Sequence, residues 1–261
     1  MFTEILFKIL ATAAIVLTLS LIAERVSARI AGLLTGAPLG ALIVFSFLAR
    51  EKDGAYFAEA VPHGLAGLIG TLAFAYGYHL GCRGGPRLGL LTATLGGMTA
   101  YAAATLPLRA IDFTLVPALL TALTAIAAAA FLFRRIENVL VARAVRLTPL
   151  VLAVRAGLAA LLVTLVIALA EWGGPVITGL LVGFPMTLLP TYLIVHATYG
   201  AAPVSTMIRN FPLGLGGLIS FLLVIRVVAP AWGPYPAIAL GVLAAVSYLA
   251  ALSMLMARRQ T

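Results

Sequence analysis

Long runs of apolar residues, each close to the length of a membrane-spanning helix, follow one another along the chain. The run at 113–133, FTLVPALLTALTAIAAAAFLF, holds no charged residue and does not alternate between apolar and polar positions. A helix needs about 20 apolar residues to cross a bilayer. The pattern therefore predicts an all-α, polytopic transmembrane helix bundle. Nine helices are expected, at about 5–23, 30–49, 61–80, 88–106, 113–133, 149–170, 176–199, 211–230 and 234–256.

The chain also contains an internal duplication. IAGLLTGAP at 30–38 returns as ITGLLVGFP at 177–185, an offset of 147 residues, and PHGLAGLI at 62–69 returns as PLGLGGLI at 212–219. Chance matches between membrane segments mostly involve Ala and Leu, whereas these matches also align the sparser Gly and Pro. The first four predicted helices therefore correspond to the last four. We expect a first membrane repeat at 1–106, a connector helix and basic loop at 107–148, and a second membrane repeat at 149–261.

The two repeats are predicted to be inverted. Five helices separate equivalent starting points, and because five is odd, the second repeat enters the membrane from the opposite side. Inverted repeats are a recurring plan of secondary transporters. The alternative is a parallel duplication in which 113–133 does not cross, which gives eight helices.

Composition and charge place the chain in a membrane and orient it. Hydrophobic residues make up 63% of the chain and charged residues 10%, whereas about a quarter of a soluble domain is charged. With nine helices, 12 of the 17 Lys and Arg residues gather on one face, which the positive-inside rule makes cytoplasmic. We expect a multi-pass protein of the bacterial inner membrane with a cytoplasmic carboxyl terminus and a periplasmic amino terminus. The eight-helix alternative puts both termini inside.

The duplicated Gly- and Pro-containing stretches indicate a candidate site. Pro38 and Pro185 each remove a backbone donor near the middle of a predicted helix, and Pro190 is expected to break the second copy again. Interrupted segments at corresponding positions of two inverted halves mark a midplane substrate site in transporters. Close packing of two helices through their glycines is the alternative. The predicted substrate-binding residues are Gly36, Pro38, Gly183, Pro185, Thr187, Pro190 and Thr191.

Three ionisable residues are candidates for proton or ion coupling. Glu24 and Glu171 occupy corresponding ends of two predicted helices, and His196 lies near the end of another. An intramembrane carboxylate or imidazole can carry a proton. The alternative places both carboxylates at headgroup level, paired with nearby Arg, and the histidine at the membrane interface.

Catalysis finds no support in the sequence. The three histidines are scattered, Cys82 is a single cysteine, and no nucleophile motif or phosphate-binding glycine loop is present. We expect no enzymatic activity, no cofactor and no metal.

The segment GLLVGFPMTLLPTYLIVHATYG at 179–200 resembles the GlpM-like family of small bacterial inner-membrane proteins. The shared features are a Gly-Leu start, a Phe-Pro step, a Thr-containing apolar run and a His before a Gly-ended loop, over about 40 residues. Family members resemble one repeat of this chain, and one is associated with production of an exopolysaccharide. The first repeat departs from the pattern, because Ala37 and Ala49 stand where the second has Phe184 and His196. The resemblance implies an envelope-linked setting in the inner membrane.

The sequence therefore predicts a transporter-like membrane protein. A small molecule, an ion or a lipid-linked precursor would pass through a midplane site between helices two and seven. The alternative is a non-transporting accessory or scaffold protein for envelope exopolysaccharide production. The expected surroundings are a bilayer with anionic headgroups, which accounts for the net charge of +9 without a nucleic-acid partner. A second copy of the chain and an envelope-assembly protein are the protein partners left open.

Overall fold

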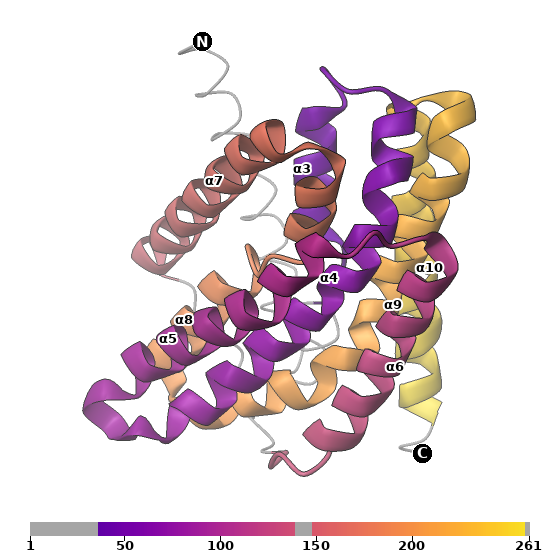
Figure 1. The fold of residues 1–261 in the computed structure, drawn as a ribbon. Coiled ribbons are helices and arrows are strands. Elements are labelled where there is room, and N and C mark those ends of the chain that lie inside the picture. Colours follow the sequence, from indigo (N-terminus) through magenta and orange to yellow (C-terminus); the bar gives the residue numbers. More distant parts are fainter. Residues whose placement is uncertain (1–35, 139–147, 259–261) are drawn as a thin grey trace.

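The structure, a computed structural model, describes residues 36–138 and 148–258 and folds them into helices (Figure 1). No strand occurs in these two ranges, so the all-α prediction is confirmed for them. The predicted helix at 5–23 lies outside the described residues. The elements are α3 (Leu39–Leu48), α4 (Gly54–Gly81), η1 (Cys82–Gly84), α5 (Gly85–Thr105), η2 (Leu106–Ala110), α6 (Leu115–Phe133), α7 (Pro149–Val182), α8 (Leu188–Tyr199), α9 (Ala201–Trp232) and α10 (Pro234–Arg258).

Five helices in the described ranges are long and apolar enough to cross a membrane. They are α4 with η1, α6, α7 from Gly157 onward, α9 and α10. α5 has spanning length but is rich in Gly and Thr, and α3 and α8 are short. The chain is therefore a membrane protein with several apolar helices, while nine helices are not confirmed by the residues described.

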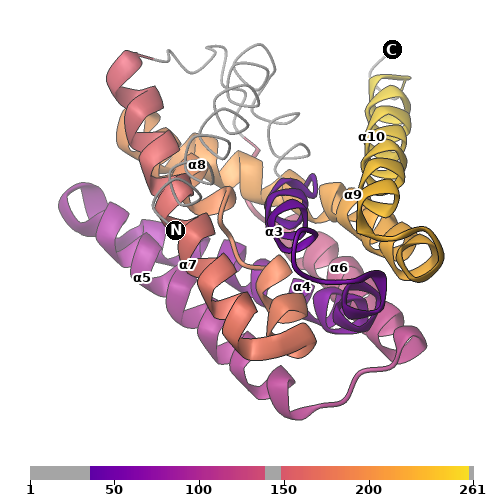
Figure 2. The ribbon, with the colours of Figure 1, turned by 90° about the horizontal axis from the view of Figure 1, so that it is seen from above.

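α4 lies at the centre of the bundle and runs antiparallel to α9. The start of α4, at Gly54, lies against Ala229 near the end of α9. The end of α4 meets the start of α9, where His79 Nδ1 and Ser205 Oγ are 3.1 Å apart. α5 packs on α4 and α10 packs on α9, so these two helices lie at opposite ends of the bundle in both views (Figures 1 and 2).

α5 and α10 begin in the same way. Gly85 has φ 79° and ψ 176°, and Gly233 has φ 81° and ψ 174°. Each glycine is followed by a proline, and the two turns are 148 residues apart. A positive φ suits glycine, and proline is tolerated in the first turn of a helix because its missing N–H has no intrahelical partner there. Equivalent positions of the proposed repeats therefore have the same local structure.

α7 is two helices joined by a sharp turn. Gly174 has φ 68° and ψ −170°, and Pro175 follows it. The helix predicted at 176–199 thus begins directly after this turn as the last part of α7, ends at Val182, and resumes as α8 at Leu188. A full-length span at 176–199 is replaced by two shorter helices with a break between them.

Candidate functional site

The two duplicated Gly-Pro stretches both fall in non-helical backbone. Gly36, Ala37 and Pro38 precede α3, and residues 183–187 separate α7 from α8. Proline cannot donate to the carbonyl one turn earlier, and its ring clashes with that carbonyl. The predicted interruption of the helix at 176–199, at Gly183 and Pro185, is therefore confirmed. For Pro38, the structure shows that α3 begins directly after it, and the residues before Gly36 lie outside the described range.

Both breaks line one small cavity. Its volume is about 30 Å³, comparable to one water molecule. Five of the predicted substrate-binding residues lie around it. The lining residues are Gly36, Ala37, Pro38, Gly40, Ala41, Thr71, Val182, Gly183, Phe184, Pro185, Thr187, Leu188, Phe211, Leu215 and Leu218.

Each break packs against the long central helix of the other half. A Cβ added at Gly36 would lie 2.3 Å from the carbonyl carbon of Gly214 in α9. A Cβ added at Gly183 would lie 2.7 Å from the carbonyl oxygen of Gly67 in α4. Gly36 and Gly183 are equivalent at the offset of 147, and Gly214 lies one helical turn before Gly217, the counterpart of Gly67 in the second pair of matching stretches. The two contacts are therefore reciprocal to within one helical turn, and in both of them only glycine permits so close an approach.

Carbonyls at the turn and at the end of α7 are bonded by side chains from α4 and α5. Thr71 Oγ1 donates to the Gly183 carbonyl at 2.5 Å, and Tyr101 Oη donates to the Leu180 carbonyl at 3.3 Å. At the Gly174 turn, Tyr56 Oη donates to the Ala170 carbonyl at 3.3 Å. In a bilayer, free backbone groups are tolerated only where protein or a polar cavity satisfies them. The interruptions are therefore supported by dedicated side chains.

The described residues that line the cavity include no ionised side chain. Among its lining residues, only Thr71 and Thr187 carry polar side chains. The Thr71 hydroxyl is already engaged with the Gly183 carbonyl, and Thr187 is half-buried at the start of α8. The site therefore offers hydroxyl and backbone groups, which suit hydrogen bonding and the coordination of a small hard cation.

Pro190 and Thr191 do not line this cavity. Pro190 lies in the first turn of α8, where proline is tolerated. The expectation of a second break at Pro190 is therefore wrong. Thr191 Oγ1 donates back to the Thr187 carbonyl at 2.7 Å, a local bond that threonine commonly makes within a helix.

The three predicted coupling residues are not brought together at the cavity. Glu24 lies outside the described residues. Glu171 is exposed in α7 and lies close enough to Tyr56 to interact with it electrostatically. His196 lies near the far end of α8, where its Nδ1 is 3.2 Å from Tyr78 Oη and 3.9 Å from Cys82 Sγ. Neither Glu171 nor His196 belongs to the cavity lining.

Sequence reasoning missed the side chains that support the breaks. Tyr56, Thr71 and Tyr101 are 79 to 114 positions from the carbonyls they bond, and no local pattern marks them. His63 also differs from the other two histidines. It is 6% exposed, packed edge-on against Phe113, with both ring nitrogens lacking a hydrogen-bond partner among the described residues.

Comparison of the chain with known proteins gives no family assignment, and the resemblance to GlpM-like proteins stays a prediction. No protein-family model, curated protein or solved structure matches it.

Proposed function

We propose that the protein is a small inner-membrane transporter whose substrate passes between the two broken helices. The observation that carries the proposal is the shared cavity. Two Gly-Pro stretches, 147 residues apart in the chain, line the same cavity. Interrupted helices that meet at equivalent positions of two halves are a recurring form of substrate site in secondary transporters.

Inverted repeats are part of this proposal, and the packing of the central helices supports them. α4 and its proposed counterpart α9 run antiparallel, with the start of each helix beside the end of the other. Inverted halves place their equivalent helices in opposite directions, whereas parallel halves place them in the same direction. The reciprocal glycine contacts and the matching turns at Gly85 and Gly233 agree with the inverted arrangement.

The small cavity corresponds to a closed state of such a transporter. A space of about 30 Å³ holds one water molecule and excludes a larger solute. Transport would require one half to rock against the other around the glycine contacts. Because the described part of the lining carries hydroxyls and no ionised side chain, a small neutral solute or a small cation fits better than an anion or a bulky lipid-linked precursor. Any coupling through Glu171 or His196 would act from outside the cavity.

Sided labelling of a cysteine in the cavity tests the proposal. Thr187→Cys is placed in a Cys82→Ser background, and sealed vesicles of known orientation are treated from either side with a charged, membrane-impermeant thiol reagent. We expect Thr187→Cys to be modified from both sides, because alternating states open the cavity to each in turn. Thr124→Cys is the matched control, since Thr124 is exposed on α6, whose surface would face lipid.

The outcomes separate a transporter from a scaffold. Modification of Thr187→Cys from both sides, with Thr124→Cys unreactive, supports transport through this site. If Thr187→Cys resists modification from both sides in folded protein, the cavity is a packing seam. The accessory role in envelope polysaccharide production would then replace the transporter proposal.

A further inference from the structure

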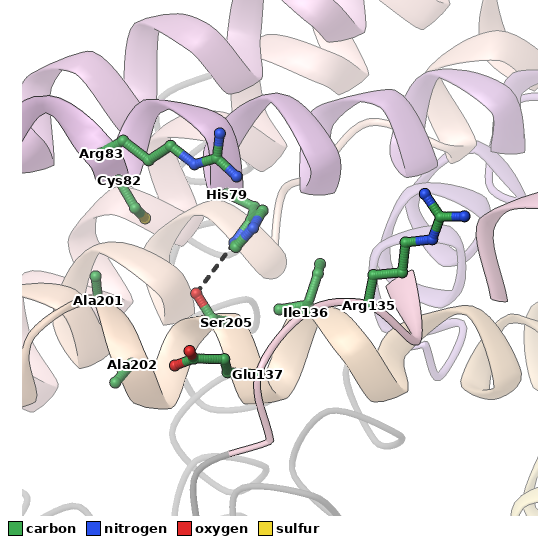
Figure 3. A pocket seen from close by; sticks show the side chains of 9 residues that line it. All are labelled: His79, Cys82, Arg83, Arg135, Ile136, Glu137, Ala201, Ala202 and Ser205. Atoms are coloured by element: carbon green, nitrogen blue, oxygen red, sulfur yellow. Dashed lines mark hydrogen bonds between the residues drawn. The ribbon is translucent and has the colours of Figure 1, made fainter. Parts of the chain in front are cut away.

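A second, larger pocket lies where three helices end. It is bounded by the end of α4, the segment that follows α6 and the start of α9, and its volume is about 440 Å³ (Figure 3). The apolar span of α4 closes at Gly84, that of α6 closes at Phe133, and that of α9 opens at Ala201. Because three candidate spans terminate here, the pocket lies at the level of the membrane surface. Ligand sites of small molecules have volumes of about 300–1,000 Å³.

Two arginine residues from different elements are part of the lining of this pocket. Arg83 belongs to η1 and Arg135 follows α6, and both side chains are exposed. Neither has an ion pair within the described part of the chain. Guanidinium groups bind phosphate oxygens in pairs of parallel hydrogen bonds. Basic pockets between transmembrane helices on the cytoplasmic side of a membrane bind phosphate-containing headgroups.

The floor of the pocket is polar and held in place. His79 Nδ1 and Ser205 Oγ lie 3.1 Å apart (Figure 3), which leaves His79 Nε2 as a second group for a ligand. Arg209 of α9 donates to the Ile136 carbonyl and so ties the segment with Arg135 to α9. Ala201 and Ala202 of α9 complete the wall.

Glu137 adds a negative charge to the same lining. Its carboxylate extends from the segment after α6 (Figure 3), and it has no ion pair among the residues described. A simple anion would be repelled by this carboxylate, whereas a ligand that carries a positive charge as well as a negative one would form an ion pair with it. We propose that the pocket binds a headgroup that carries a phosphate and a primary ammonium. Arg83, Arg135 and His79 bind the phosphate, and Glu137 binds the ammonium.

This site is separate from the midplane cavity. The two pockets share no lining residue. The inference therefore holds whether or not the protein transports a solute. Its ligand chemistry is present both in the aminophospholipids of a membrane and in soluble phosphoethanolamine.

Binding to the delipidated full chain in a phosphate-free detergent tests the proposal, with native mass spectrometry as the readout. The probes are phosphatidylethanolamine, phosphatidylglycerol and soluble O-phosphoethanolamine. We expect phosphatidylethanolamine to bind more tightly than phosphatidylglycerol by roughly fivefold, as one exposed ion pair allows. Glu137→Gln should remove this preference, because it removes the partner of the ammonium.

Two further variants test the phosphate half of the site. Arg83→Gln together with Arg135→Gln should weaken phosphatidylethanolamine binding by roughly tenfold or more, since charge-assisted hydrogen bonds to phosphate are lost. Arg50→Gln together with Arg109→Gln is the matched control, because both side chains are exposed and lie outside the pocket. The unfolding temperature without ligand shows that each variant is folded.

Each result decides between the site and its absence. Competition by O-phosphoethanolamine supports the site and assigns a soluble source to its ligand, whereas binding of the lipid alone supports the site and assigns a membrane source. Equal binding of both lipids by the wild type would overturn the role of Glu137. Unchanged phosphatidylethanolamine binding in the double arginine variant would overturn the site.

Discussion

The hydrogen bond from Thr71 to the Gly183 carbonyl should be a measurable part of the free energy of unfolding. Thr71 is 4% exposed, and its hydroxyl is 2.5 Å from the Gly183 oxygen. In a continuous helix this carbonyl would accept from the amide of Thr187, but the break removes that partner. Thr71→Val keeps the shape of the side chain and leaves a buried carbonyl without a donor.

The expected cost of Thr71→Val is about 1–2 kcal/mol. An unsatisfied buried group costs about 1–3 kcal/mol in proteins generally. Hydrogen bonds between membrane helices average about 0.6 kcal/mol and reach about 1.7 kcal/mol. The upper part of that range applies here because Gly183 is buried and lies in non-helical backbone. The change therefore removes a large fraction of the usual stability of a small protein.

Reversible unfolding of the purified chain in mixed micelles measures this cost. Thr94→Val is the matched control. The Thr94 hydroxyl donates to the Leu90 carbonyl within α5, at 2.7 Å, and that carbonyl keeps its ordinary helical amide after the change. We expect Thr94→Val to alter stability by less than about 0.5 kcal/mol. Equal effects of the two valine variants would refute the claim that α4 supports the break.

Three further predictions follow from the same packing. Gly36→Ala should destabilise the fold by about 1–3 kcal/mol because its Cβ would meet the α9 backbone. Gly157→Ala, with open space around its Cβ, should be neutral or stabilising by up to about 1 kcal/mol, and unfolding in micelles compares the two variants. Tyr101→Phe should lower the free energy of unfolding by about 1 kcal/mol, since it leaves the Leu180 carbonyl without its donor. Tyr192→Phe should cost nothing, because the buried Tyr192 hydroxyl has no partner among the described residues. Equal losses in the same assay would contradict the role of Tyr101. Pro185→Ala should slow sided labelling of the cavity cysteine, because a restored amide favours a continuous helix; an unchanged rate in folded protein would remove Pro185 from the opening mechanism.

Sequence alone predicted where the backbone is interrupted, because Gly and Pro act locally. Pro185 removes an amide wherever it stands in a helix interior, so the break at 183–187 follows from the chain itself. Pro190 misled the prediction for a related reason. Its effect depends on its position in a helix, and only the structure reveals that α8 begins two residues before it.

The partners of the interrupted backbone could not be predicted from sequence. Tyr56, Thr71 and Tyr101 look like ordinary residues of membrane helices, and their roles depend on how α4 and α5 pack against α7. The placement of His196 away from the cavity has the same origin. Its distance from the break along α8 was visible in the sequence, but its contacts with Tyr78 and Cys82 come from helix packing.

The larger pocket, at the ends of α4 and α6 and the start of α9, shows a second limit of sequence reasoning. Arg83, Arg135 and Glu137 were visible only as charges near the ends of predicted helices. They become a site because the ends of α4 and α6 lie beside the start of α9. Charge counting predicts a cytoplasmic face of the protein but not this cluster of residues.

The central claim is that the chain consists of two inverted halves which each contribute a broken helix. The side of the membrane on which two equivalent positions lie tests this claim most directly. Glu51 and Thr198 are exposed and 147 residues apart, just before α4 and just before α9. Glu51→Cys and Thr198→Cys, each in a Cys82→Ser background, are labelled in intact cells with an impermeant thiol reagent. The account predicts that Glu51→Cys is modified from the periplasm and that Thr198→Cys reacts only after the membrane is opened. Modification of both positions from the same side would contradict the inverted repeats and, with them, the proposed site.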